Sequence, residues 1–105
     1  MIHHIDLYKL NPDVDEERLE EMIRCTRSQL LKIQEVRNLR CGKRVEKDSE
    51  WPFFVALDIE NLDKLAMFHD DPHRIKFVEE VVKPNTANHI ALDYEMEPGK
   101  DVRYS

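Results

Sequence analysis

The sequence predicts an α+β fold in which two helical regions cover one face of a four-stranded antiparallel sheet. Three observations predict it. A chain of 105 residues is long enough for a single core, extended and helical patterns follow one another in the order β-α-β-β-α-β, and the extended segments alternate in polarity. We expect one domain over residues 1–96 and a polar C-terminal tail over residues 97–105.

Residues 2–10 are predicted to form the first strand, which ends at Asn11 and Pro12. Successive side chains of a strand point to opposite faces. One face therefore carries His4, Asp6 and Tyr8, and the other carries His3, Ile5 and Leu7.

Residues 13–33 are predicted to form the first helix, because apolar side chains recur at spacings of three and four residues. The apolar stripe consists of Leu19, Met22, Ile23, Thr26, Leu30 and Ile33. Acidic residues dominate the start of this segment and arginines its later turns, which suits the helix dipole. We expect the charged residues to form a solvent-exposed face.

Two further strands are expected, one within residues 35–46 with a bulge or bend at Gly42, and one over residues 51–59. One face of the latter is apolar and consists of Phe53, Val55, Leu57 and Ile59. Its other face, with Phe54, Ala56 and Asp58, is partly apolar. Such a strand needs cover on both faces.

The second helical region is predicted to break at Asp71 and Pro72, giving a short helix over residues 61–69 and another over residues 72–82. Proline is disfavoured inside a helix but suits its first turn, and aspartate is a good N-cap. His73 then lies in the first turn of the second helix. The last strand is expected over residues 89–96.

This order of elements is typical of a ferredoxin-like protomer with both helices on one sheet face. The opposite face then presents an apolar patch of Ile5, Leu7, Phe54 and Ala56. Soluble monomers seldom expose such a patch. We therefore expect a homodimer in which two sheets pack together.

Composition argues against several functional classes. The chain has 16 basic and 22 acidic residues, a net charge of −6, which disfavours nucleic-acid binding. Two glycines are too few for a Rossmann fingerprint or a P-loop. No apolar run is long enough to span a membrane, and the N-terminus does not resemble a secretory signal. Cys25 and Cys41 lack CxxC spacing and are expected to be thiols, so we expect a cytoplasmic protein.

Over residues 1–96 the chain resembles the stress-responsive dimeric α/β-barrel (Dabb) family. The markers of the resemblance are the opening segment from His4 to Leu10, the turn Cys41-Gly42-Lys43, the strand 51–59, the helix break Asp71-Pro72-His73 and the closing Ala91-Leu92-Asp93-Tyr94. The resemblance implies a protomer that dimerises into a barrel, with a pocket between sheet and helices.

Within that family the chain is distantly similar to plant polyketide cyclases of the olivetolic acid cyclase type, which close a ring by aldol chemistry without a cofactor. The resemblance implies that His73 and His4 match two pocket histidines of these enzymes. Met67 and Phe53 stand where the cyclases have a tyrosine and a further histidine.

Candidate catalytic residues are His73, His4 and Asp6. A neutral imidazole near a helix N-terminus can act as a general base, which favours His73 in that role. An aspartate that faces a pocket needs a partner, so Asp6 either orients a histidine or joins His4 and His73 in a metal site. A third alternative places Asp6 at the rim, facing water.

Aromatic and apolar side chains are candidates for lining a ligand pocket, namely Tyr8, Phe53, Met67 and Trp51. His69, at the end of a helix, and His89, in the last strand, are expected to be structural. The sequence thus predicts a homodimer that binds or transforms a small carbonyl-containing compound by aldol, isomerase or lyase chemistry with a histidine base and no cofactor. The alternative is a non-enzymatic, stress-related structural or binding dimer.

Overall fold

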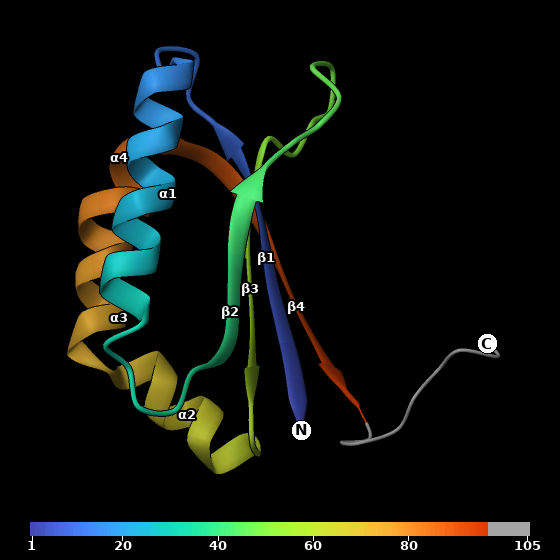
Figure 1. Cartoon of the computed structure of the whole chain (residues 1–105), viewed down its shortest axis with the longest axis vertical. Coiled ribbons are helices and arrows are strands. Elements are labelled where there is room, and N and C mark those ends of the chain that lie inside the picture. The colour runs from blue at the N-terminus through green and yellow to red at the C-terminus, as the bar shows by residue number, and fades with distance from the viewer. Residues whose placement is uncertain (97–105) are drawn as a thin grey trace, which may run out of the picture.

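The computed structural model describes residues 1–96, so the predicted polar tail lies outside the described residues. Figure 1 shows the helices gathered on one side of a twisted sheet. The elements in chain order are β1 (Ile2–Leu10), α1 (Glu16–Leu30), β2 (Arg37–Lys43), β3 (Phe53–Ile59), α2 (Leu62–Asp70), α3 (Pro72–Phe77), the π-helical segment η1 (Val78–Val82), α4 (Lys83–Asn85) and β4 (Thr86–Glu95).

The sheet has the strand order β2-β3-β1-β4, and each neighbouring pair is antiparallel. The predicted ferredoxin-like arrangement is therefore confirmed. β1 lies between β3 and β4, with His4 directly opposite Leu57 on one side and Asp93 on the other. Residues directly opposite each other in a pleated sheet share a face.

The predicted alternation of β1 and β3 is confirmed, and their helix-facing side chains form the centre of the core. On β3, Phe53, Val55, Leu57 and Ile59 are all buried, and on β1 so are Ile2, His4 and Tyr8. The apolar stripe of α1 packs onto this face through Leu19, Met22, Thr26 and Leu30. Burial of these apolar surfaces is the main force that holds the two layers together.

The helix predicted over residues 13–33 is shorter, because its ends are set by specific caps. Asp15 is the N-cap, and its carboxylate accepts a hydrogen bond from the Arg18 N–H at 2.8 Å. Glu16 and Glu17 follow in the first turn, where the helix dipole favours acids. α1 ends at Leu30, and Ile33 is buried in the connection that follows.

The predicted break in the second helical region is confirmed. Asp71 caps α3 by accepting a hydrogen bond from the His73 N–H at 2.8 Å, and Pro72 occupies the first turn. The single helix predicted to Val82 is wrong in detail, since η1 is π-helical. Pro84 has no N–H for the carbonyl of Glu80, which disrupts the α pattern at this end.

The bend predicted at Gly42 lies elsewhere. The pairing of β2 with β3 is irregular between Arg37 and Arg40, where Asn38 has a φ of 51°. Asparagine tolerates this left-handed conformation better than most residues. Gly42 instead allows a close approach, because a Cβ there would lie 3.2 Å from Phe54 Cε1.

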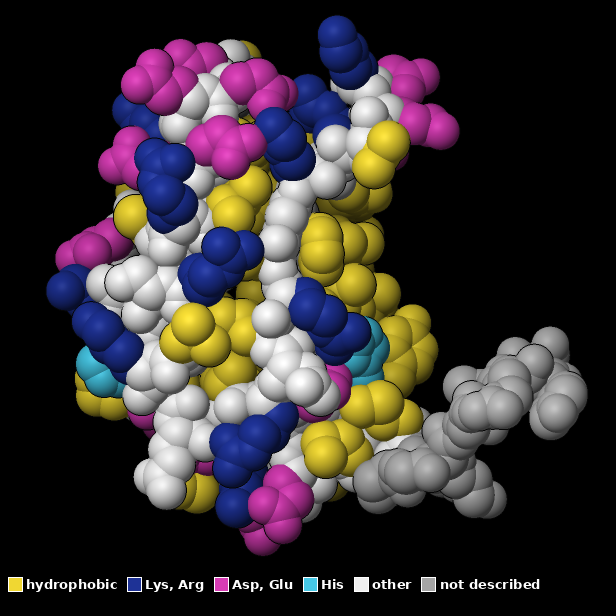
Figure 2. All heavy atoms as spheres, in the orientation of Figure 1, with side chains coloured by type: hydrophobic (Ala, Val, Ile, Leu, Met, Phe, Trp, Pro, Cys, Tyr) yellow, Lys and Arg dark blue, Asp and Glu magenta, His cyan; other side chains and the backbone are white. Residues whose placement is uncertain are grey.

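The sheet face opposite the helices carries an apolar patch, which we call the outer face. Figure 2 shows hydrophobic side chains gathered along this side of the sheet. Besides the predicted residues of β1 and β3, β4 contributes Ile90 and Leu92, which are 38% and 37% exposed, and Tyr94. The patch is thus wider than the sequence indicated.

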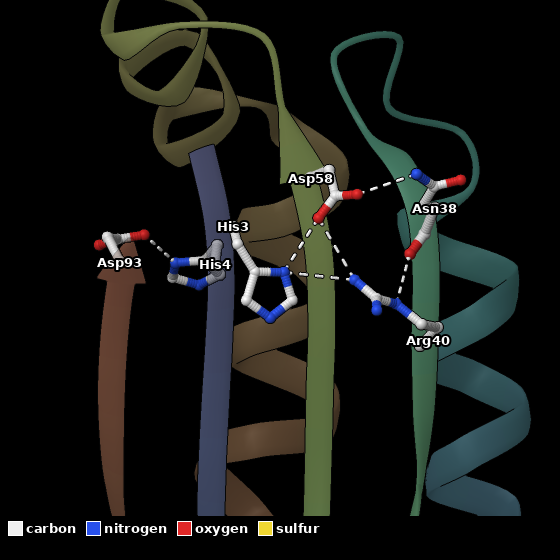
Figure 3. Close-up of polar contacts among 6 residues, drawn as sticks. All are labelled: His3, His4, Asn38, Arg40, Asp58 and Asp93. Atoms are coloured by element: carbon white, nitrogen blue, oxygen red, sulfur yellow. Dashed lines mark hydrogen bonds and ion pairs between the residues drawn. The ribbon is translucent and has the colours of Figure 1, made fainter. Parts of the chain in front are cut away.

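A polar network borders the outer face around Asp58, which is only 5% exposed. Its carboxylate accepts hydrogen bonds from His3 Nδ1 at 3.0 Å, Asn38 at 2.8 Å and Arg40 at 3.3 Å (Figure 3). Burial alone raises the pKa of Asp58, but these donors outweigh it and lower the pKa. His3 therefore points away from His4, as predicted.

Within residues 1–96, no helix is both long and apolar enough to cross a membrane.

Candidate functional site

The helix layer leaves the edge strand β4 open. Every residue of β4 after Thr86 is exposed, whereas α1 packs on β2 and α2 packs on β3. We call the helix-facing side chains of these two strands the β1–β4 shelf; its β4 members are exposed, whereas His4 and Tyr8 of β1 are buried. It consists of His4, Asp6 and Tyr8 from β1 and His89 and Asp93 from β4.

His4 lies at the centre of this shelf, between two carboxylates. Its Nε2 is 2.8 Å from Asp6 Oδ2, and its Nδ1 is 2.6 Å from Asp93 Oδ1. Figure 3 shows the second contact, which joins β1 to β4. The side chain of His4 is 3% exposed, that of Asp6 15% and that of Asp93 42%. Asp6 is thus the inner partner of His4, and Asp93 is the outer partner.

The two carboxylates favour the charged form of His4. Burial by itself lowers the pKa of His4, but the hydrogen bonds and charges of Asp6 and Asp93 together raise it above its ordinary value. As an imidazolium, His4 donates a hydrogen bond from each ring nitrogen. His4 is therefore suited to donate a proton rather than to accept one.

Tyr8 forms the next part of the shelf. Its ring stacks against Phe53, with centroids 5.4 Å apart, and against His89, with centroids 5.6 Å apart. Burial raises the pKa of Tyr8, and the charge of Asp6 raises it further. Tyr8 is therefore a neutral phenol that can donate a hydrogen bond.

His69, which was expected to be structural, lies over the shelf from α2. Its ring centroid is 6.1 Å from that of His4, and the neighbouring Phe68 ring is 5.9 Å from His4. Burial lowers the pKa of His69, and the positive charges of Arg74 and His4 lower it further. The pKa values of these two neighbouring imidazoles are therefore shifted in opposite directions, the contrast expected of an acid and base pair.

The other predicted site residues lie in different surroundings. His73 is half-buried, and within residues 1–96 its side chain makes no hydrogen bond or ion pair. Met67 is 55% exposed, while Trp51 lies under the ammonium of Lys9, 5.0 Å from it. Phe53 is fully buried in the core. The structure thus joins His4, Asp6, Tyr8 and Phe53, and no described contact links the other three to them.

The predicted metal alternative finds no matching geometry. Among residues 1–96, no three His, Cys, Asp or Glu side chains are grouped so that they can hold a metal ion. Both ring nitrogens of His4 are already engaged by carboxylates. The roles of His4, Asp6 and His73 as ligands therefore have no support from this arrangement.

The space between the helices and β3 is filled by side chains, since Phe53 and Leu57 are fully buried. Two hollows of about 390 and 450 Å³ lie near the β2–β3 connection, where Leu19 and Arg44 line both. Neither is lined by His4 or His73. The predicted pocket between sheet and helices therefore stays a prediction, and the accessible side chains of the β1–β4 shelf are those of the edge strand β4.

A small ferredoxin-like domain with a buried histidine held between two carboxylates next to an exposed edge strand is the class defined by this fold and site. The chain belongs to the stress responsive A/B barrel domain (Dabb) family, whose model matches residues 2–96. The resemblance seen in the sequence is thereby confirmed. The narrower similarity to plant polyketide cyclases stays a prediction. No curated protein matches the chain by sequence.

Solved structures share the fold. A Dabb family protein from Mesorhizobium loti matches with a TM-score of 0.79 at 14% identity, covering 91% of this chain and 96% of that one. A dimeric ferredoxin-like protein of unknown function from Thermobifida fusca matches with a TM-score of 0.81 at 22% identity and 90% of each chain. A hydroxynitrile lyase from Passiflora edulis matches with a TM-score of 0.78 at 11% identity, over 95% and 96%.

Proposed function

We propose that this protein is a homodimer that binds a small carbonyl compound on the β1–β4 shelf and transforms it by acid–base chemistry without a cofactor. One observation carries the proposal, the buried histidine held between Asp6 and Asp93. A buried charged group is costly, and a core filled with apolar side chains is often as stable without it. Ionisable groups with perturbed pKa values gather at functional sites, and the pKa of His4 is raised.

The two carboxylates have different roles in this proposal. Asp93 is the more exposed one, so a ligand can displace it from His4 Nδ1. Asp6 keeps its hydrogen bond to Nε2 and orients the ring. The vacated N–H then donates to the carbonyl oxygen of the ligand.

The step that follows is enolisation. His69 accepts a proton from the carbon next to the carbonyl, and the electrons of that C–H bond form a carbon–carbon double bond. The carbonyl π electrons move to oxygen, which takes the proton of His4 Nδ1. His69 ends as an imidazolium and His4 as a neutral imidazole. The enol can then be protonated elsewhere or attack a second carbonyl, as isomerisation or aldol cyclisation requires.

The proposal shifts the base from His73 to His69, because His69 packs against His4 and has a lowered pKa. The assignment of His73 as the base stays a prediction. It is tested by including His73→Ala among the variants of the exchange experiment described below.

The homodimer follows from the outer face. Ile90 and Leu92 widen its apolar patch, and the relatives from Thermobifida fusca and Bacteroides fragilis are described as dimeric. Contact with a second copy removes this surface from water.

The experiment measures exchange of the α-protons of cyclohexanone in D₂O by proton NMR. We expect the wild-type protein to accelerate exchange beyond an equal concentration of free imidazole. His4→Gln and His69→Gln should each lower the rate at least about tenfold, as removal of a positioned acid or base does. His3→Gln, on the opposite face of β1, is the matched control and should leave the rate unchanged.

Equal exchange rates in the wild type, His4→Gln and His69→Gln would contradict the proposal. If those variants then lost only stability, the non-enzymatic dimer would be the better description. The filled space around Phe53 and Leu57 favours that second candidate.

A further inference from the structure

Arg74 lies beside the β1–β4 shelf and has no acidic partner there. Its guanidinium carbon is 5.8 Å from the centre of the Phe68 ring. That ring is in turn 5.9 Å from His4 and 5.6 Å from His69. Arg74 is half-buried, and within residues 1–96 its side chain forms no ion pair or hydrogen bond.

The charges around the shelf show why this matters. Asp6 and Asp93 both interact with His4, and within residues 1–96 neither forms an ion pair with Arg74. The positive charge of Arg74 nevertheless reaches the shelf. Burial is the largest cause of the lowered pKa of His69, and Arg74 lowers it further. Arg74 also opposes the rise in the pKa of Tyr8. A ligand that displaces Asp93 removes one negative charge from His4. A ligand with its own negative charge restores the balance.

We infer that Arg74 is an anion subsite, and that the shelf takes small carbonyl compounds that carry a carboxylate. This inference rests on the proposed function, because it assumes that the carbonyl oxygen lies at His4 Nδ1. A guanidinium presents two parallel N–H groups that match the two oxygens of a carboxylate. The aromatic face of Phe68 orients the guanidinium and shields it from water on one side.

The inferred ligand is a monoanion. Arg74 is a single cation, and within residues 1–96 no lysine or second arginine forms an ion pair or cation–π contact with the shelf residues or with Phe68 and His69. A phosphate, with close to two negative charges, is usually held by several donors. A keto acid therefore fits the site better than a phosphorylated carbonyl compound.

The experiment compares levulinate with methyl levulinate, which keep the same ketone and differ in the charge of the carboxyl group. Binding is followed through the imidazole signals of His4 and His69 by NMR titration. We expect levulinate to bind the wild-type protein about tenfold or more tightly than the ester. Arg74→Gln should remove that preference and leave the weaker binding of the ester unchanged.

Two further variants sharpen the test. Arg24→Gln, on the exposed face of α1, is the matched control and should keep the preference for levulinate. Arg74→Lys keeps the positive charge without the paired N–H groups and should keep part of the preference for levulinate. If Arg74→Gln does not fold, the wild-type comparison of the two ligands still decides.

Equal binding of the acid and the ester by the wild type would overturn the anion subsite alone and leave the proposed function standing. If Arg74→Gln weakened the binding of levulinate and of the ester equally, the anion subsite would also be overturned, because Arg74 would then act only on the packing of Phe68. If neither ligand moved the His4 signal, the proposed function and the subsite would both be wrong.

Discussion

At the scale of single residues, His4 links the stability of the fold to pH. Although burial lowers the pKa of His4, the interactions with Asp6 and Asp93 raise it above the ordinary value of 6.5. Stability from a raised pKa is fully present below the unfolded value and is lost as the pH rises through the folded value. Each unit of such a shift corresponds to about 1.4 kcal/mol.

We therefore predict that the free energy of unfolding falls as the pH rises above about 6.5, and that His4→Gln removes this fall. Urea unfolding from about pH 6 to about pH 9 measures it. His69 does not cause this fall. Burial lowers the pKa of His69, so its contribution to the free energy of unfolding is lost only as the pH falls below its ordinary pKa. If the free energy of unfolding fell equally with pH in the wild type and in His4→Gln, a group other than His4 would cause the fall.

At the scale of elements, the break between α2 and α3 positions the groups that face the shelf. His69 lies just before the break and Arg74 just after it. The carboxylate of Asp71 stabilises this geometry by capping α3 through the His73 N–H. The predicted chemistry of the site therefore depends on a local capping interaction.

We predict that Asp71→Ala lowers the free energy of unfolding by about 1 kcal/mol, the usual effect of losing an N-cap. For a domain of this size the melting temperature should fall by roughly 4–8 °C. Asp70→Ala is the matched control, since the neighbouring Asp70 is exposed and caps no helix. Thermal unfolding measures both, and an equal loss in the control would argue against the cap.

At the scale of the whole molecule, the outer face predicts association. Its apolar side chains come from the three strands β1, β3 and β4, so a second sheet can cover them in one contact. A domain of 105 residues has a small core, and dimerisation adds buried surface to it.

We predict that the protein sediments at twice 12.6 kDa and that Leu92→Lys shifts it toward the monomer, because an unpaired ammonium is costly to bury. Leu62→Lys, at an exposed leucine of α2, is the matched control and should remain dimeric. Sedimentation equilibrium at micromolar concentration measures both. A wild-type monomer at that concentration would disprove the dimer.

Local patterns in the sequence predicted the elements and several details of their geometry. The alternation of β1 puts His4 and Asp6 on one face, and their hydrogen bond is the result. The break at Asp71 and Pro72 followed from capping and proline chemistry alone. These predictions succeeded because each depends on residues within a few positions of one another.

Only the tertiary structure decided which distant groups meet His4. Asp93 is 89 residues away and reaches it through the register of β1 with β4, which no local pattern specifies. His69 lies over β1 because of the way α2 packs on the sheet, and Arg74 follows after the break. The sequence by itself therefore determined the fold and the common face of His4 and Asp6, while leaving the partner of Asp6 open. The outer carboxylate, the second histidine and the unpaired arginine depended on long-range packing, because strand register and helix placement are set by many contacts at once.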